Sequence, residues 1–296
     1  MAEQVPPRSE ATVPTGPSVT LYTSGSALSS PALLFRAMLK DLAASRSLAW
    51  RLAVRDISAQ YRTSYLGYVW AFATPLISTA IWIFLSMSGV VRVAETGIPY
   101  PAYVFTGTML WQMFTEALAS PLTQVSAAKS MLAKLNFPRE SLILAGAYKV
   151  LFSAAIKLVV VVPIIFLFGV RPDWHLVLVP LVVLVIILLG ISIGLLLAPI
   201  GTLYADIGRM IPLVTQLLMY LTPVVFPMPL SGAMARLFAL NPTTPLILTG
   251  RSWLTASGGA QVEAVLVLGA IGAGLLLVGW VFYRITMSVL VERMSS

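Results

Sequence analysis

The chain has 296 residues, of which 58% are hydrophobic and only 10% are charged, whereas a soluble domain usually carries about 25% charged residues. With a mean hydropathy of +0.90, this composition excludes an ordinary soluble domain and indicates a polytopic membrane protein. The net charge of +8 does not point to nucleic acid, because the cations lie at the ends of apolar runs, where they set topology and contact anionic headgroups. The chain has no cysteine and one histidine, so we expect neither a disulfide nor a metal site.

The first 65 residues contain two segments of different character. Residues 1–30 are rich in Pro, Ser, Thr and Ala, and they are expected to form a disordered cytoplasmic tail. Residues 31–65 mix apolar side chains such as Trp50 and Leu52 with arginines, which is typical of an amphipathic helix lying in the membrane interface. A soluble amphipathic helix is the alternative. The rest of the chain, residues 66–296, is expected to form a transmembrane domain.

Six apolar runs approach the length of about 20 residues that a spanning helix needs. We therefore predict an all-α fold with six transmembrane helices. The fifth run is short, and prolines crowd its end, so its helix is expected to break near Thr222–Pro229. In chain order, the runs are Leu66–Val90, Tyr100–Leu122, Leu142–Phe168, Leu176–Leu197, Ile211–Phe226 and Ala264–Tyr283.

The segment between the fifth and sixth runs, residues 227–263, is unusually apolar for a loop. Pro, Gly and Asn punctuate it, which favours short half-helices that re-enter the outer leaflet. A small extracellular cap is the alternative.

Lysine and arginine are concentrated on one side of the predicted spans, and cytoplasmic flanks carry such an excess. Both termini are therefore expected in the cytoplasm, which agrees with an even number of spans. The cations on that side are Arg36, Lys40, Arg46, Arg51, Arg55, Arg62, Lys129, Lys134, Arg139, Arg209, Arg284 and Arg293, against Arg92, Arg171, Arg236 and Arg251 on the other.

Several groups of residues resemble the membrane subunits of ABC exporters of O antigen, teichoic acid and capsular polysaccharide. The resemblance extends in family order from about Arg55 to Arg251, and the tail at 1–30 has no counterpart in it. The residues that carry it are Arg55-Asp56 with Leu66–Trp70 and Pro75-Leu76, then Lys134–Glu140, Asp206–Pro212, Gln216, Tyr220–Val224, Pro227, Leu240–Pro242 and Gly250-Arg251.

The resemblance implies a permease subunit in a bacterial inner membrane. Such a subunit is expected to form a homodimer, to bind two separate ATPase subunits, and to move an undecaprenyl-type lipid-linked polysaccharide from the cytoplasm to the outer face. No GxxxxGK[ST] loop occurs in the sequence, so ATP and Mg²⁺ are expected on the partner, with no enzymatic activity and no cofactor on this chain.

The segment Ser130–Glu140 is expected to couple this chain to the ATPase. Its apolar side chains would enter a groove on the ATPase, and its cations would add charge complementarity. The alternative is a cationic loop that contacts only lipid headgroups. The residues assigned to coupling are Lys129, Met131, Leu132, Lys134, Leu135, Phe137 and Arg139.

Three ionisable residues lie inside predicted spans, where charges are costly and usually face a partner or a wet cavity. Counting from the inner ends of their spans places Glu116 and Lys149 at a similar depth, so we predict an ion pair between them. Lys157 lies deeper, with no acid predicted at its level. It could line the polysaccharide path or be buried against backbone carbonyls.

Aromatic residues and arginines are assigned to the substrate. Aromatic rings stack on the C–H faces of sugars, so Trp82, Tyr103, Trp111 and Phe114 are candidates for the polysaccharide path, with core packing as the alternative. Because arginine forks match phosphate oxygens, Arg51, Arg55 and Arg62 are candidates for capture of the lipid phosphate, with surface anchoring as the alternative. Arg209 could pair with Asp206 or bind a pyrophosphate headgroup.

Two other functions stay open at this point. A permease of the same class could export a drug or a lipid, and the residues alone do not separate it from a polysaccharide exporter. A membrane-embedded glycosyltransferase needs clustered acids at the membrane edge, whereas Asp56, Glu140 and Asp206 are isolated.

Overall fold

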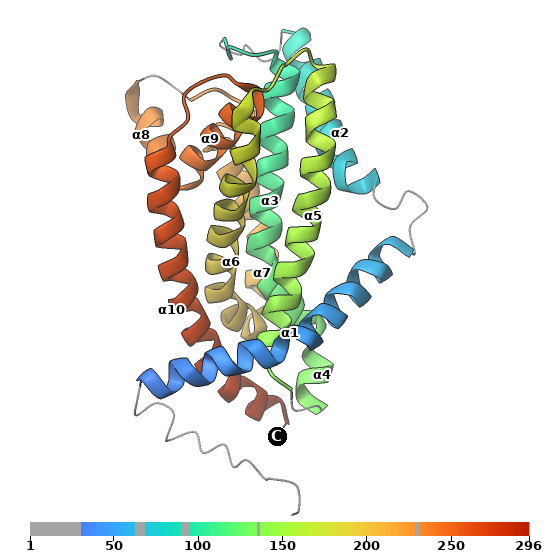
Figure 1. The fold of residues 1–296 in the computed structure, drawn as a ribbon, viewed down its shortest axis with the longest axis vertical. Helices are drawn as coiled ribbons and strands as arrows, with labels where there is room; N and C mark the ends of the chain where they lie inside the picture. Colours follow the sequence, from blue (N-terminus) through green and yellow to red (C-terminus); the bar gives the residue numbers. More distant parts are fainter. Residues whose placement is uncertain (1–30, 63–68, 90–94, 135–136, 229–230, 296) are drawn as a thin grey trace, which may run out of the picture. The chain divides into compact units, whose positions relative to one another are not determined.

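The computed structural model describes residues 31–62, 69–89, 95–134, 137–228 and 231–295, and none of these residues lies in a strand (Figure 1). The chain divides into two compact units, Met1–Asp41 and Leu42–Ser296. The described part of the first unit is the beginning of helix α1, and all other helices belong to the second. The predicted tail at 1–30 and the predicted turn at Gly67 lie outside the described residues.

The all-α prediction is confirmed for the described residues, and three helices are long and apolar enough to cross a membrane: Glu140–Leu167, Trp174–Leu203 and Val262–Met287. They coincide with the third, fourth and sixth predicted spans. The helices are α1 (Pro31–Arg62), α2 (Trp70–Met87), α3 (Tyr100–Ala127), α4 (Lys129–Lys134), α5 (Glu140–Leu167), α6 (Val179–Leu203), α7 (Ala205–Tyr220), α8 (Gly232–Leu240), α9 (Thr243–Thr255) and α10 (Val262–Ser295), with a 3₁₀ turn at Trp174–Leu178 before α6.

Helix α3 is the centre of the larger unit. It packs against α2, α5, α6, α7 and α9, and Figure 1 shows it between α5 and α6. From Ala102 to Trp111 every side chain of α3 is buried. The polar residues of this stretch, Thr106 and Thr108, are therefore enclosed by other helices, whereas Glu116 and Thr123 further along α3 are exposed.

The close packing of α3 against α6 depends on two glycines one turn apart. A Cβ at Gly190 would lie 2.9 Å from the carbonyl oxygen of Phe114, and one at Gly194 would lie 2.2 Å from that of Leu118. This Gly-x-x-x-Gly pattern lets two helix backbones approach, which is how helices associate where water supplies no driving force. On another face of α6, the Ser192 hydroxyl donates a hydrogen bond to the Gly272 carbonyl of α10 at 2.9 Å.

The part of α1 that belongs to the larger unit has a buried face and an exposed face, and its place in a membrane interface stays a prediction. Ala49, Leu52 and Ala53 lie in the hydrophobic core, whereas Arg51 and Arg55 are exposed. The Trp50 ring also meets Tyr148 of α5 edge-on, with 5.8 Å between ring centroids.

The predicted break after the fifth apolar run is confirmed, because α7 ends at Tyr220 and residues 221–226 form turns. The next segment contains two short helices, α8 and α9, and their re-entry into the membrane stays a prediction. Nearly all side chains of α9 are buried, and it packs against α3 and α6.

Candidate functional site

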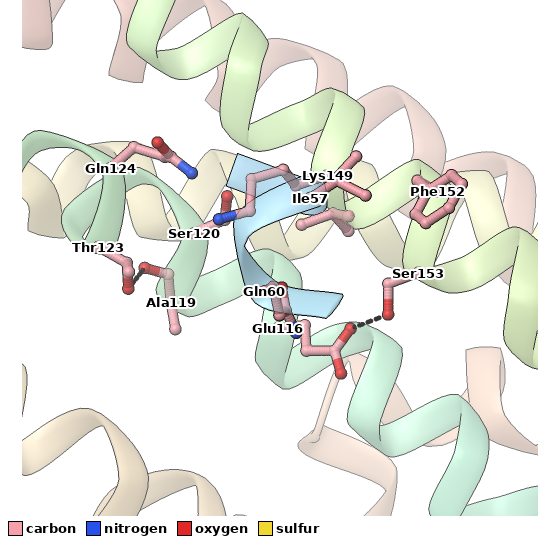
Figure 2. Close-up of a pocket in the computed structure, with 11 residues that line it drawn as sticks. Ile57, Gln60, Glu116, Ala119, Ser120, Thr123, Gln124, Lys149, Phe152 and Ser153 are labelled. Carbon is pink, nitrogen blue, oxygen red and sulfur yellow. Dashed lines mark hydrogen bonds between the residues drawn. The ribbon is translucent and has the colours of Figure 1, made fainter. Parts of the chain in front are cut away.

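A pocket of about 290 Å³ lies between the end of α1, the second half of α3 and the middle of α5 (Figure 2). Figure 2 shows Glu116 of α3 at its edge, joined by a hydrogen bond to Ser153 of α5. The other lining residues are Ile57, Gln60, Ala119, Ser120, Thr123, Gln124, Lys149, Val150 and Phe152.

The ion pair predicted between Glu116 and Lys149 is wrong. The Lys157 ammonium instead donates to Oε1 of Glu116, and Ser153 Oγ donates to Oε2 at 2.8 Å. Lys149 Nζ lies 3.8 Å from a carboxylate oxygen of Asp56 in α1. Depth counted from the inner end of each helix selected the wrong lysine, because the packing of α3 against α5, and not depth alone, decides which one reaches the carboxylate.

Lys157 is only 1% exposed and Glu116 is 42% exposed, so the cation of this pair is buried and the anion is partly exposed. The prediction that no acid lies near Lys157 is therefore corrected. The proposed contact of this lysine with a polysaccharide stays a prediction, because its ammonium is engaged by Glu116 in this structure.

The four aromatic residues assigned to the polysaccharide path do not share one surface of this chain. Three of them are buried, as the packing alternative expects: Tyr103, Trp111 and Phe114. The ring centroids of Trp111 and Phe114 lie 5.3 Å apart. Trp82 of α2 is half-buried and packs edge-on against Phe226, with 5.1 Å between the ring centroids. Contact of these rings with a polymer stays a prediction.

Arg251 of α9 is 3% exposed, although its sequence position places it in an external loop. Its guanidinium carbon lies 3.6 Å from the centre of the Tyr103 ring, and Nη2 donates to the Val224 carbonyl at 2.9 Å. Nε and Nη1 are buried and have no hydrogen-bond partner among the described residues. Tyr103 in turn donates to the carbonyl of Phe226 at 3.1 Å. Arg251 and Tyr103 therefore fix the turn that follows α7.

The segment assigned to coupling contains α4, a helix of six residues that packs against α3 and α10. Leu132 is 4% exposed and belongs to the core, so its predicted place on an exposed docking surface is wrong. A short amphipathic helix needs an apolar anchor, and Leu132 serves as one. Met131 is half-buried, Phe137 packs against the core, and Lys129 donates to the Thr202 carbonyl at 3.1 Å. The side chains of Lys134 and Leu135 lie outside the described part.

The end of the same segment is attached to α10 by two contacts. Glu140 accepts a hydrogen bond from Nη1 of Arg284 at 2.9 Å, and its side chain is 8% exposed. The Tyr283 hydroxyl donates to the Arg139 carbonyl at 3.4 Å. These contacts tie the start of α5 to α10.

The three arginines assigned to lipid phosphate are all exposed. Arg55 is already paired with its neighbour Asp56, at 2.9 Å. Asp206 and Arg209 form an exposed pair at 3.5 Å, which was one of the two predicted alternatives.

On the loop before α6, Asp173 accepts from the backbone N–H and the ring Nδ1 of His175, and these hydrogen bonds lower the pKa of the carboxyl group. Within the described residues, no three His, Asp or Glu side chains form a group that could hold a metal ion.

The sequence did not predict the Asp56–Lys149 pair, the Glu140–Arg284 pair or the burial of Arg251. These contacts join residues far apart in the chain, and only the packing of the helices reveals them. The Gly190–Gly194 spacing did offer a signal, because Gly-x-x-x-Gly in an apolar run indicates a helix-packing face.

Comparison with known proteins gives consistent results. The family model described as ABC-2 type transporter matches residues 47–254. The O-antigen export system permease protein RfbA of Myxococcus xanthus is 25% identical over 243 residues, which cover 81% of this chain and 92% of that protein. Two proteins of the same name from Klebsiella pneumoniae are 25% identical over 236 and 231 residues, covering 78% and 76% of this chain and 88% and 86% of theirs. Since the family model covers most of the chain and the resemblance in the motifs is confirmed, this protein belongs to the ABC-2 type transporter family.

Proposed function

We propose that this chain is the permease subunit of an ATP-driven exporter that moves a lipid-linked polysaccharide, such as O antigen, from the cytoplasmic to the outer face of the membrane. The observation that carries this proposal is the similarity to three O-antigen export permeases over most of this chain and of each relative. The motifs at Lys134–Glu140 and Asp206–Pro212 fall inside the aligned family region.

In this proposal α2, α3 and α7 complete six spans with α5, α6 and α10, and both termini are cytoplasmic. At about 1.5 Å per residue, the 18 residues of α2 rise about 27 Å, close to the thickness of the hydrocarbon core. Helices α8 and α9 are re-entrant, which the burial of α9 supports. The larger part of α1 lies in the interface, with its arginines directed to lipid phosphates.

ATP hydrolysis takes place on a separate ATPase, and two copies of each subunit form the exporter. Helix α4 is the docking element, because it begins at the exposed Lys129 and is attached to α6 and α10. Met131 and Phe137 remain candidates for contact with the ATPase, since neither is fully buried.

Deletion of the gene tests this function. We expect the cells to lose surface polysaccharide and to accumulate the lipid-linked chain inside, and an intact copy of the gene to restore export. Normal surface polysaccharide with altered tolerance to a drug would refute the proposal and favour export of a drug or lipid.

A further inference from the structure

The pocket between α1, α3 and α5 contains an unusual carboxylate. Glu116 lies in the middle of α3, and a charge inside a membrane helix is costly unless it faces a partner or a wet cavity. Ser153 binds one of its oxygens and Lys157 the other. Each carboxylate oxygen accepts more than one hydrogen bond, and the side chain is 42% exposed. Glu116 therefore keeps acceptor capacity on the side that faces the pocket.

The rest of the pocket is rich in uncharged polar groups. Ser120, Thr123 and Gln124 follow Glu116 at intervals that place them along one side of α3, and Gln60 approaches from α1 (Figure 2). Hydroxyl and amide groups both donate and accept hydrogen bonds. Phe152 and Ile57 add apolar surface. The polar side chains suit a ligand with many hydroxyl groups, and the apolar side chains suit the C–H faces of its ring.

The charges of the pocket balance one another. The two charged residues that line it, Glu116 and Lys149, have opposite signs. Lys157 donates to Glu116, and Lys149 Nζ lies 3.8 Å from Asp56, which also accepts from Arg55 at 2.9 Å. A phosphate or pyrophosphate group needs an excess of donors with positive charge, usually from arginine or unpaired lysine. The charge balance therefore favours an uncharged ligand over a lipid phosphate.

The volume of about 290 Å³ lies just below the range of small-molecule sites, roughly 300–1,000 Å³. It has room for one small group and not for a polymer chain.

We propose that the α1–α3–α5 pocket binds a single uncharged sugar residue of the lipid-linked glycan, with Glu116 accepting hydrogen bonds from its hydroxyl groups. This inference rests on the proposed export of polysaccharide and adds a defined sugar subsite to it. The exposed arginines of α1 would hold the phosphate separately, outside the pocket.

Photo-crosslinking in cells tests the ligand directly. A diazirine amino acid replaces Thr123, which lines the pocket, or Val159 of α5, which is 75% exposed and does not line it. After illumination, the purified chain is treated with periodate and hydrazide to detect sugar, and adducts are identified by mass spectrometry. We expect sugar-bearing adducts at position 123 and only lipid adducts at position 159. Adducts at 123 that contain polyprenyl phosphate or phospholipid without sugar, or no adducts at all, would overturn the inference.

A matched pair of variants measures the contribution of the pocket. Thr123→Val removes a hydroxyl that lines it and otherwise bonds only to the Ala119 carbonyl of its own helix, so the change keeps the shape of the side chain. Thr115→Val makes the same change on α3 outside the pocket. In a strain with limiting lipid-linked substrate, we expect Thr123→Val to slow export about three- to tenfold, the range for one lost hydrogen bond. Equal rates for both variants, at equal membrane levels, would contradict the inference.

The two proposals fail separately. Normal surface polysaccharide after deletion of the gene refutes the export function. If deletion abolishes surface polysaccharide while position 123 gives sugar-free adducts, the export function stands and the sugar subsite is refuted.

Discussion

At the scale of single residues, Gly107 is the position where the smallest change should have a large effect. A Cβ at this position would lie 2.3 Å from Nη2 of Arg251 and 2.4 Å from the Val224 carbonyl oxygen. One of these atoms belongs to a buried guanidinium and the other to the backbone, so neither can move freely. Gly107 therefore provides the space in which Arg251 reaches Tyr103 and the turn after α7.

We expect Gly107→Ala to lower the free energy of unfolding by about 1–3 kcal/mol, the usual cost of overpacking a core. Chemical unfolding in mixed micelles measures this difference. Gly274→Ala in α10 is the matched control, because a Cβ there meets no atom within 4 Å. Gly274→Ala should be neutral or slightly stabilising, because alanine favours a helix by up to about 1 kcal/mol over glycine. If Gly107→Ala behaved in the same way, the close approach of Arg251 and Val224 would not be responsible.

The Glu116–Lys157 pair should respond asymmetrically to removal of its partners. Glu116→Ala leaves a lysine that is 1% exposed without its anion, and breaking a buried pair in this way costs about 3–5 kcal/mol. Lys157→Met leaves a carboxylate that is partly exposed and still bonded to Ser153, so we expect a loss of about 1 kcal/mol or less.

Chemical unfolding of the two single variants and of the double variant checks this asymmetry. Glu116→Ala combined with Lys157→Met should recover most of the stability that Glu116→Ala loses, because methionine fills the space without a charge. A larger loss for Lys157→Met than for Glu116→Ala would mean that the buried cation is satisfied by other groups.

At the scale of elements, the contact between the start of α5 and α10 determines how the cytoplasmic side is held together. Glu140→Ala removes the nearly buried partner of Arg284, and we expect it to cost about 3 kcal/mol of unfolding free energy. The exchange Glu140→Arg with Arg284→Glu should restore part of this loss. Asp206→Asn is the control, since it breaks an exposed pair one turn apart, which is worth about 0.3–0.5 kcal/mol. Equal losses for the two pairs would contradict a structural role for Glu140.

The positions of the long helices were largely predictable, although α7 begins and ends six residues before the predicted run Ile211–Phe226. Contacts between elements were not predictable. Long apolar runs predicted α5, α6 and α10, and the prolines after Leu221 predicted the end of α7, because these signals are local. Leu132 and Arg251 were misjudged because each looks exposed in its own segment. Their burial arises only when α4 packs against α10 and α9 folds back onto α3. The partner of Glu116 depended in the same way on a helix crossing that the sequence does not specify.

At the scale of the whole molecule, the topology of the chain determines which segments lie in the cytoplasm, where ATP is present, and which lie outside the cell. The proposed six spans place α4 and the loop between α6 and α7 in the cytoplasm, and the loops after α2 and α9 outside. The absence of cysteine from the sequence makes this arrangement testable with single cysteines in an unmodified background.

Three exposed serines suit this purpose: Ser88 after α2, Ser130 in α4 and Ser257 after α9. A membrane-impermeant maleimide should label Ser88→Cys and Ser257→Cys in intact cells. It should label Ser130→Cys only after the cells are permeabilised. The arginine and lysine excess around α4 is the physical reason for this expectation. If Ser130→Cys were labelled in intact cells, α4 would lie outside the cell. A cytoplasmic ATPase could then not bind α4, and the proposed coupling would be wrong.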